Sequence, residues 1–142
     1  ITRILDRHGN VLEENKPRLS QVISPKTAYL MTSLLQSVVE EGTGRGVRAL
    51  KRPCAAKTGT TSDMRDAWFI GFTPKLVAGV WLGFDDLSPL GKHETGGVAA
   101  APVWLDFMQQ ALQAEPVQTF KAPESVVFTI KRNGAPSPNY AP

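Results

Sequence analysis

The 142-residue sequence contains one cysteine, Cys54, and two histidines, His8 and His93. A single cysteine excludes an intrachain disulfide, and the apolar stretch around Cys54 favours a small buried residue over a nucleophile. The histidines are far apart, with no second His or Cys at ligand spacing. Because a zinc site needs three or four converging ligands, we expect no metal site. No cofactor is expected either.

No apolar run is long enough to cross a membrane. The longest, residues 76–84, contains two glycines and is bounded by Lys75 and Asp85, whereas a transmembrane helix needs about 20 apolar residues. The 16 Lys and Arg residues are scattered, so nucleic-acid binding is not indicated. No signal peptide is present, and the strand-like start at Ile1 indicates a piece of a longer protein.

The composition is that of an ordinary globular domain, with 42% hydrophobic and 20% charged residues. Turn residues Gly9 and Asn10 predict a β-hairpin over residues 1–12. Ser24 and Pro25 predict a helix start. The helix should stop at Gly42. The apolar positions that recur on one helical face are Ala28, Met31, Leu34, Leu35, Val38 and Val39.

Three strands are predicted after Cys54. The first leads into residues 57–61, and the second and third cover residues 67–72 and 76–84. The connection over residues 73–75 is so short that the last two strands should form an antiparallel hairpin.

A glycine-containing loop over residues 85–97 should precede a second helix, which Pro102 opens. Its broad apolar stripe, which belongs against a sheet, comprises Val103, Trp104, Leu105, Phe107, Met108, Ala111 and Leu112. A strand is expected over residues 125–131, and the ending "NGAPSPNYAP" should be a loose tail. Together these elements predict an α+β fold, an antiparallel sheet with packed helices.

The stretch "KTGTT" at the start of the central strands has the composition of an anion-binding wall. Side chains alternate along a strand, so Thr58 and Thr60 should project together, while Lys57 and Gly59 face the other way. Two hydroxyls about 7 Å apart can hold a carboxylate, and Lys57 adds a positive potential. Gly59 permits a close approach. On an edge strand, free backbone groups would pair with an extended peptide, and the N–H of Thr60 would face a developing oxyanion.

The surroundings of this motif carry a specific resemblance. "KTGTT" is followed by "DAWFIGFTP" and "VAGVWLGFDD", preceded by "YLMTSLLQSVVEEGTG", and then followed by "ETGGVAAAPVWLDFM". In this order and spacing, residues 1–130 resemble the C-terminal half of the transpeptidase domain of class A penicillin-binding proteins. The implied fold is part of the penicillin-binding and serine β-lactamase-like transpeptidase fold. One small departure is Ala56, where the family more often has glycine.

The resemblance implies a D,D-transpeptidase that cross-links peptidoglycan stem peptides ending in D-Ala-D-Ala and is acylated by β-lactams. It assigns catalytic roles to Lys57, in proton traffic, and to Thr60, whose N–H forms half of the oxyanion hole. The substrate-binding positions would be Thr58, Gly59, Thr60 and Thr61. Structural roles are favoured for Thr43, Asp66 and Trp68.

The family's nucleophile motif, S-x-x-K, is absent from this sequence. The one S-x-N, Ser137-Pro138-Asn139, lies on the wrong side of "KTGTT" and is interpreted as a chance match. Acyl transfer needs the nucleophile, its base and the oxyanion donors together. We therefore expect the isolated chain to be inactive.

The composition changes at Pro116, where prolines become frequent, so the chain is divided into residues 1–115, expected to be the C-terminal part of the transpeptidase domain, and a Pro-rich extension over residues 116–142. The partners that the resemblance implies are the stem peptide, β-lactams and the missing N-terminal part of the domain. The resemblance also implies a parent protein anchored at the periplasmic face of the inner membrane. In this family the parent protein often has a glycosyltransferase domain as well. The fragment itself is expected to be soluble, and its exposed apolar surface makes a homodimer plausible. Two alternatives stay open: a non-catalytic peptide- or cell-wall-binding module, and a β-lactamase or β-lactam sensor fragment.

Overall fold

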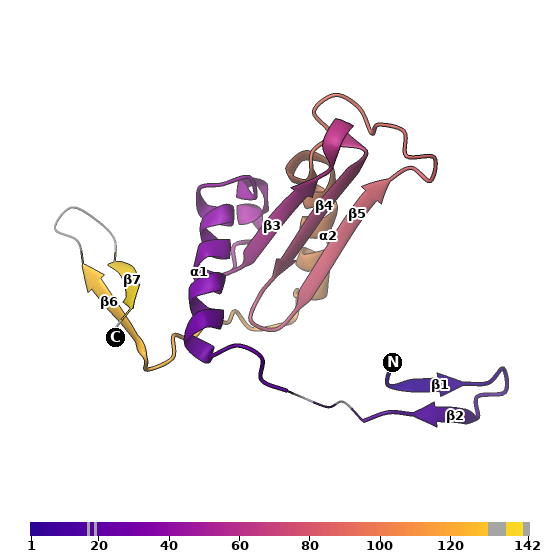
Figure 1. Ribbon diagram of the computed structural model, residues 1–142, viewed down its shortest axis with the longest axis horizontal. Coiled ribbons are helices and arrows are strands. Elements are labelled where there is room, and N and C mark those ends of the chain that lie inside the picture. Colours follow the sequence, from indigo (N-terminus) through magenta and orange to yellow (C-terminus); the bar gives the residue numbers. More distant parts are fainter. Residues whose placement is uncertain (17, 19, 131–135, 141–142) are drawn as a thin grey trace.

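The computed structural model describes residues 1–16, 18, 20–130 and 136–140. A three-stranded antiparallel sheet is flanked by two helices, and a two-stranded hairpin lies near each end of the chain (Figure 1). The fold is therefore α+β, as predicted. Within the described part, none of the helices has the length and apolar character needed to cross a membrane.

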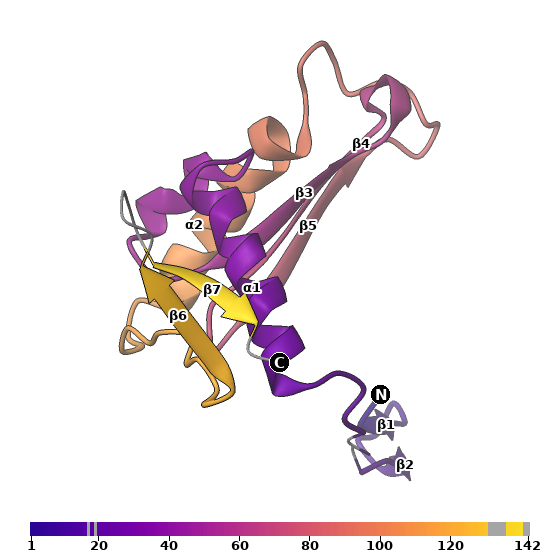
Figure 2. The ribbon, with the colours of Figure 1, turned by 60° about the vertical axis from the view of Figure 1, so that its left-hand side comes forward.

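The predicted N-terminal hairpin is confirmed, with β1 (Arg3–Leu5) antiparallel to β2 (Val11–Glu14). Gly9 supplies the turn with a φ of 86°, a backbone conformation that favours glycine. The carboxylate of Asp6 accepts hydrogen bonds from the backbone and side-chain nitrogens of Asn10, at 2.9 and 2.8 Å. Every residue of both strands is exposed, and the hairpin lies apart from the sheet in Figures 1 and 2.

The first helix, α1 (Pro25–Glu40), begins as predicted. The hydroxyl of Ser24 accepts a hydrogen bond from the backbone N–H of Thr27 at 3.1 Å, which satisfies one of the unpaired donors of the first turn. Gly42 follows the helix end as expected. A Cβ at Gly42 would lie 2.9 Å from the Cα of Val38, so this glycine is needed for space.

Two residues of the predicted apolar face of α1 are not covered by the fold, since Met31 and Leu34 are 49% and 63% exposed. The helix packs along β3 (Ala55–Thr60) and the short 3₁₀ helix η1 (Arg45–Leu50). These neighbours cover one narrow side, where burial is greatest at Val39. The apolar stripe of α1 is therefore wider than the part of the helix surface that its neighbours cover in the described part of the chain.

The central sheet has the strand order β3-β4-β5, with β4 (Asp66–Phe72) in the middle and β5 (Val77–Gly83) at one edge. Both pairings are antiparallel and regular. The three predicted strands and their hairpin are thus confirmed. β3, which carries the "KTGTT" residues up to Thr60, forms the other edge among the described residues.

The second helix, α2 (Ala101–Ala111), covers one face of the sheet (Figure 1). A single π-helical turn, η3 (Gly96–Ala100), leads into it, so helical structure begins before the predicted start at Pro102. The predicted stripe is too broad, since Val103 and Phe107 are half exposed. The residues of this helix and its C-cap that are buried are Ala101, Trp104, Met108 and Leu112.

The C-terminal strand is confirmed as β6 (Val126–Ile130). The expected loose tail is wrong for residues 136–140, which form β7 (Pro136–Tyr140) antiparallel to β6. The Pro-rich composition argued against a strand, but a two-stranded pair leaves each strand an open edge, where proline is tolerated. Residues 131–135 and 141–142 of these predictions lie outside the described residues.

Candidate active site

The alternation predicted for the "KTGTT" strand is confirmed by its register. Thr58 and Thr60 stand opposite buried residues of β4, on the face that packs against the helices. Lys57 and Gly59 stand opposite exposed residues of β4, on the other face. The two hydroxyls therefore share one side of the strand.

The backbone of β3 presents free polar groups at its outer edge. The N–H of Thr61 donates to the carbonyl of Asp66 at 3.1 Å. Hydrogen-bonded and non-hydrogen-bonded pairs alternate in an antiparallel ladder. Counting back from Thr61, the N–H and C=O groups of Thr58 and Thr60 point away from β4. No strand lies on that side in the described part of the chain, so this edge can accept an extended peptide.

Lys57 reaches the same edge although its side chain starts on the other face. Its ammonium donates to the carbonyl of Thr58 at 2.7 Å, one of the groups that point away from β4. The side chain is exposed. The positive charge therefore lies at the outward carbonyl of Thr58.

The two threonine hydroxyls have separate partners from distant parts of the sequence. Thr58 and Thr43 share a hydrogen bond of 2.8 Å between their hydroxyls. The hydroxyl of Thr60 accepts a hydrogen bond from the backbone N–H of Gly96 at 3.1 Å. Sequence reasoning placed Thr43 near the site but missed Gly96, for which the only signal was the pair Gly96-Gly97.

The hydroxyl of Thr61 forms hydrogen bonds within the connection between β3 and β4. Its hydroxyl donates to the carboxylate of Asp66 at 3.0 Å and accepts from the N–H of Asp66 at 2.9 Å. The same carboxylate accepts from the indole N–H of Trp81 at 2.8 Å. Thr61 and Asp66 thus close the connection between β3 and β4, and Trp81 ties β5 to it.

The close approach at Gly59 is to a side chain. A Cβ at Gly59 would lie 3.1 Å from the Cβ of Trp68, which is tight but not excluded. Trp68 in turn packs against Trp81, with ring centroids 6.2 Å apart. Gly59 therefore leaves room for the aromatic pair on the exposed face.

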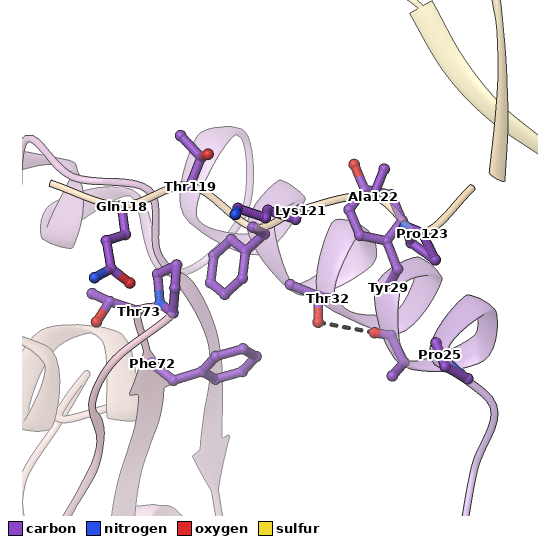
Figure 3. A pocket seen from close by; sticks show the side chains of 13 residues that line it. Pro25, Tyr29, Thr32, Phe72, Thr73, Gln118, Thr119, Lys121, Ala122 and Pro123 are labelled. Atoms are coloured by element: carbon purple, nitrogen blue, oxygen red, sulfur yellow. Dashed lines mark hydrogen bonds between the residues drawn. The ribbon is translucent and has the colours of Figure 1, made fainter. Parts of the chain in front are cut away.

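Two hollows bear on the location of the site. One, of about 640 Å³, lies at the end of β3, and its lining includes Thr60, Thr61 and Arg65. The other, of about 690 Å³, is formed by α1, the turn after β4 and residues 118–123 (Figure 3). The register places this second hollow at the opposite end of the sheet, because Phe72 pairs with the start of β3. Its lining is mainly apolar and includes none of residues 57–61, whereas the first hollow includes Thr60 and Thr61.

Cys54 does not provide an alternative nucleophile. Burial raises the pKa of its thiol from 9.0 to about 11, with a smaller contribution from the charge of Glu40. The reactive form of cysteine is the thiolate, so this thiol is unreactive near neutral pH. Among the described residues, no group of three or more His, Cys, Asp or Glu could hold a metal ion.

Comparison with known families gives a match over most of the chain. Residues 3–109 match the penicillin-binding protein transpeptidase domain. The chain is 43% identical over 131 residues to penicillin-binding protein 1A of Aquifex aeolicus, covering 92% of this chain and 18% of that protein. It is 43% identical over 133 residues to penicillin-binding protein 1A of Neisseria gonorrhoeae, covering 89% and 17%. The chain thus spans less than a fifth of the length of these relatives.

The fold has a counterpart among solved structures. Penicillin-binding protein 1A from Haemophilus influenzae superimposes with a TM-score of 0.80 at 25% identity, covering 99% of this chain and 28% of that one. The family match, the relatives and the fold agree with each other. The chain therefore belongs to the penicillin-binding protein transpeptidase domain family, in which it represents a portion of a class A member.

Proposed function

We propose that this chain supplies one wall of the active site of a peptidoglycan D,D-transpeptidase. The single observation that carries the proposal is the open edge of β3. There the Lys57 ammonium donates to the outward carbonyl of Thr58, on the same edge as the outward N–H and C=O groups of Thr60. This edge suits an extended peptide that ends in a carboxylate, such as a stem peptide ending in D-Ala-D-Ala, or a β-lactam that mimics it.

Each motif residue has a role in this wall. The substrate backbone pairs with β3, and the hydroxyls of Thr58 and Thr60 bind its terminal carboxylate. Lys57 adds a positive charge at the same edge and assists proton transfer. The N–H of Thr60 donates to the oxyanion that forms when the scissile carbonyl is attacked. Gly59 and Thr61 shape the strand on which these groups lie.

The nucleophile must come from outside this chain, because the sequence contains no S-x-x-K. In the complete reaction a serine oxygen bonds to the carbonyl carbon, D-alanine leaves, and an amine of a neighbouring stem peptide takes the acyl group. Residues 1–142 hold only the wall that binds and orients the substrate. We therefore propose that the isolated chain is inactive and that the missing partner is the N-terminal part of the same domain.

The proposal extends to the division of the chain and its cellular setting. Residues 1–115 belong to the transpeptidase domain, and residues 116–142 form a Pro-rich extension. The parent protein acts in cell-wall synthesis at the periplasmic face of the inner membrane. Class A membership is the support for this location.

A chimera tests the proposal directly. In it, this chain replaces the matching segment of the Neisseria gonorrhoeae relative, with which it shares 43% identity. We expect a fluorescent penicillin to label the chimera covalently and to leave the isolated chain unlabelled. Thr60→Ala in the chimera should lower the acylation rate about 10- to 100-fold, the effect of a lost hydrogen bond to a charged group.

The matched control is Thr119→Ala, which removes a threonine hydroxyl at the opposite end of the sheet and should leave acylation unchanged. A folded chimera that takes up no penicillin, while the Neisseria protein is labelled, would contradict the proposed wall. Stoichiometric labelling of the isolated chain would contradict its inactivity.

A further inference from the structure

The hydrogen bond between Gly96 and Thr60 joins two segments that lie 36 residues apart. The N–H of Gly96 opens the π-helical turn η3 and donates to the hydroxyl oxygen of Thr60 at 3.1 Å. Gly96 is buried, whereas Thr60 is exposed. A group fixed in the interior of the fold therefore holds the hydroxyl of an exposed residue at the end of β3.

Only glycine fits at position 96. A Cβ there would lie 2.1 Å from the carbonyl oxygen of Trp68 and 2.6 Å from that of Gly59. The φ angle of Gly96 is not in the left-handed region, so the requirement is for space and not for backbone conformation. Without a side chain, η3 lies directly against the backbones of β3 and β4, at the distance that the hydrogen bond to Thr60 needs.

This hydrogen bond decides the orientation of the Thr60 hydroxyl. A hydroxyl has one proton to donate and two lone pairs that accept. The N–H of Gly96 occupies one lone pair, so the proton of Thr60 must point elsewhere. Because the side chain is exposed, the remaining direction is outward, where the hydroxyl can donate to an anion.

We propose that Gly96 is a positioning residue for substrate binding. Its buried N–H holds the hydroxyl of Thr60 with its proton directed at the carboxylate of the stem peptide or the β-lactam. The inference rests on the proposed function of the β3 wall and adds to it a residue from outside the "KTGTT" motif. Gly96 itself does not touch the substrate.

The test uses the chimera and two probes, a penicillin with a free carboxylate and the methyl ester of the same penicillin. The ratio of their acylation rate constants reports recognition of the carboxylate. In Gly96→Ala the added methyl displaces η3, and we expect this acid-to-ester ratio to fall about tenfold, as for a lost hydrogen bond to a charged group.

The matched control is Gly71→Ala. Its Cβ would lie 2.7 Å from the ring of Trp104, a clash with a buried side chain in the core away from Thr60. This variant should lower both rate constants together and leave the ratio unchanged. Equal loss of both rates in Gly96→Ala would overturn the proposal, because a purely structural role affects the acid and the ester alike.

A second measurement does not need any substitution at Gly96. Amide hydrogen exchange at Gly96 in the chimera should accelerate about tenfold in Thr60→Ala and stay slow in Thr60→Ser, which keeps the accepting oxygen. Unchanged exchange in Thr60→Ala would overturn the proposal. An unsubstituted chimera that takes up no penicillin would instead reject the proposed function, so the two failures are distinguishable.

Discussion

At the scale of single residues, the pKa of Cys54 links burial to pH dependence. Its thiol is 4% exposed, and burial raises its pKa from 9.0 to about 11. Between these two values the unfolded chain has lost the proton that the folded chain retains. The contribution of the neutral Cys54 thiol to the free energy of unfolding is therefore fully present below about pH 9 and declines as the pH rises toward 11.

We predict a loss of about 2–3 kcal/mol of unfolding free energy between pH 9 and 11, since each pKa unit is worth about 1.4 kcal/mol. Urea denaturation of the purified chain at several pH values measures it. Cys54→Ala removes the titrating group, so this part of the pH dependence should disappear. An equally steep decline in Cys54→Ala would assign the effect to other groups.

The residues of the site were predictable only in part. The period of two along a strand places Thr58 and Thr60 on one side, and the register agrees. Their partners Thr43 and Gly96 lie 15 and 36 residues away. Which loops come close to a strand depends on tertiary packing, and no local pattern in the sequence encodes it.

At the scale of elements, start signals were more reliable than estimates of burial. Ser24 and the turn at Gly9 are local features, so the structure could be predicted from them directly. Met31 and Phe107 belong to the predicted apolar faces and are about half exposed, because apolar periodicity shows only which face is hydrophobic. It does not show how much of that face the neighbouring elements cover.

The cap of α1 gives a prediction at this scale. Ser24→Ala removes the hydroxyl that accepts from Thr27, and we expect a loss of about 1 kcal/mol in unfolding free energy. Ser37→Ala is the matched control, because it lies inside the same helix and only contacts a backbone carbonyl at 3.4 Å. Ser37→Ala should be neutral or slightly stabilising. Equal losses in both variants would argue against capping.

At the scale of the whole molecule, one face of the sheet carries large apolar side chains in contact with solvent. Trp68, Ile70, Val77 and Trp81 are 43–66% exposed on the face opposite α2. No helix covers this face in the described part of the chain, as Figures 1 and 2 show. Exposed apolar patches of this kind favour association.

We therefore predict that the isolated chain self-associates, with a mass above that of a monomer in light scattering at high concentration. Ile70→Lys should weaken association about tenfold or more, because it removes a large apolar side chain from the centre of the patch. Leu87→Lys adds the same charge at an exposed loop position and should have little effect. A strictly monomeric chain at high concentration would contradict the prediction.

The close packing around Gly96 also has an evolutionary consequence. Every amino-acid replacement of a glycine introduces a Cβ, and here that atom would collide with two backbone oxygens. Side chains can move away from such a collision, but the carbonyls of Gly59 and Trp68 are part of the sheet itself. A replacement at an exposed position such as Arg65 needs no such adjustment, whereas a change at Gly96 would need compensating shifts in two strands.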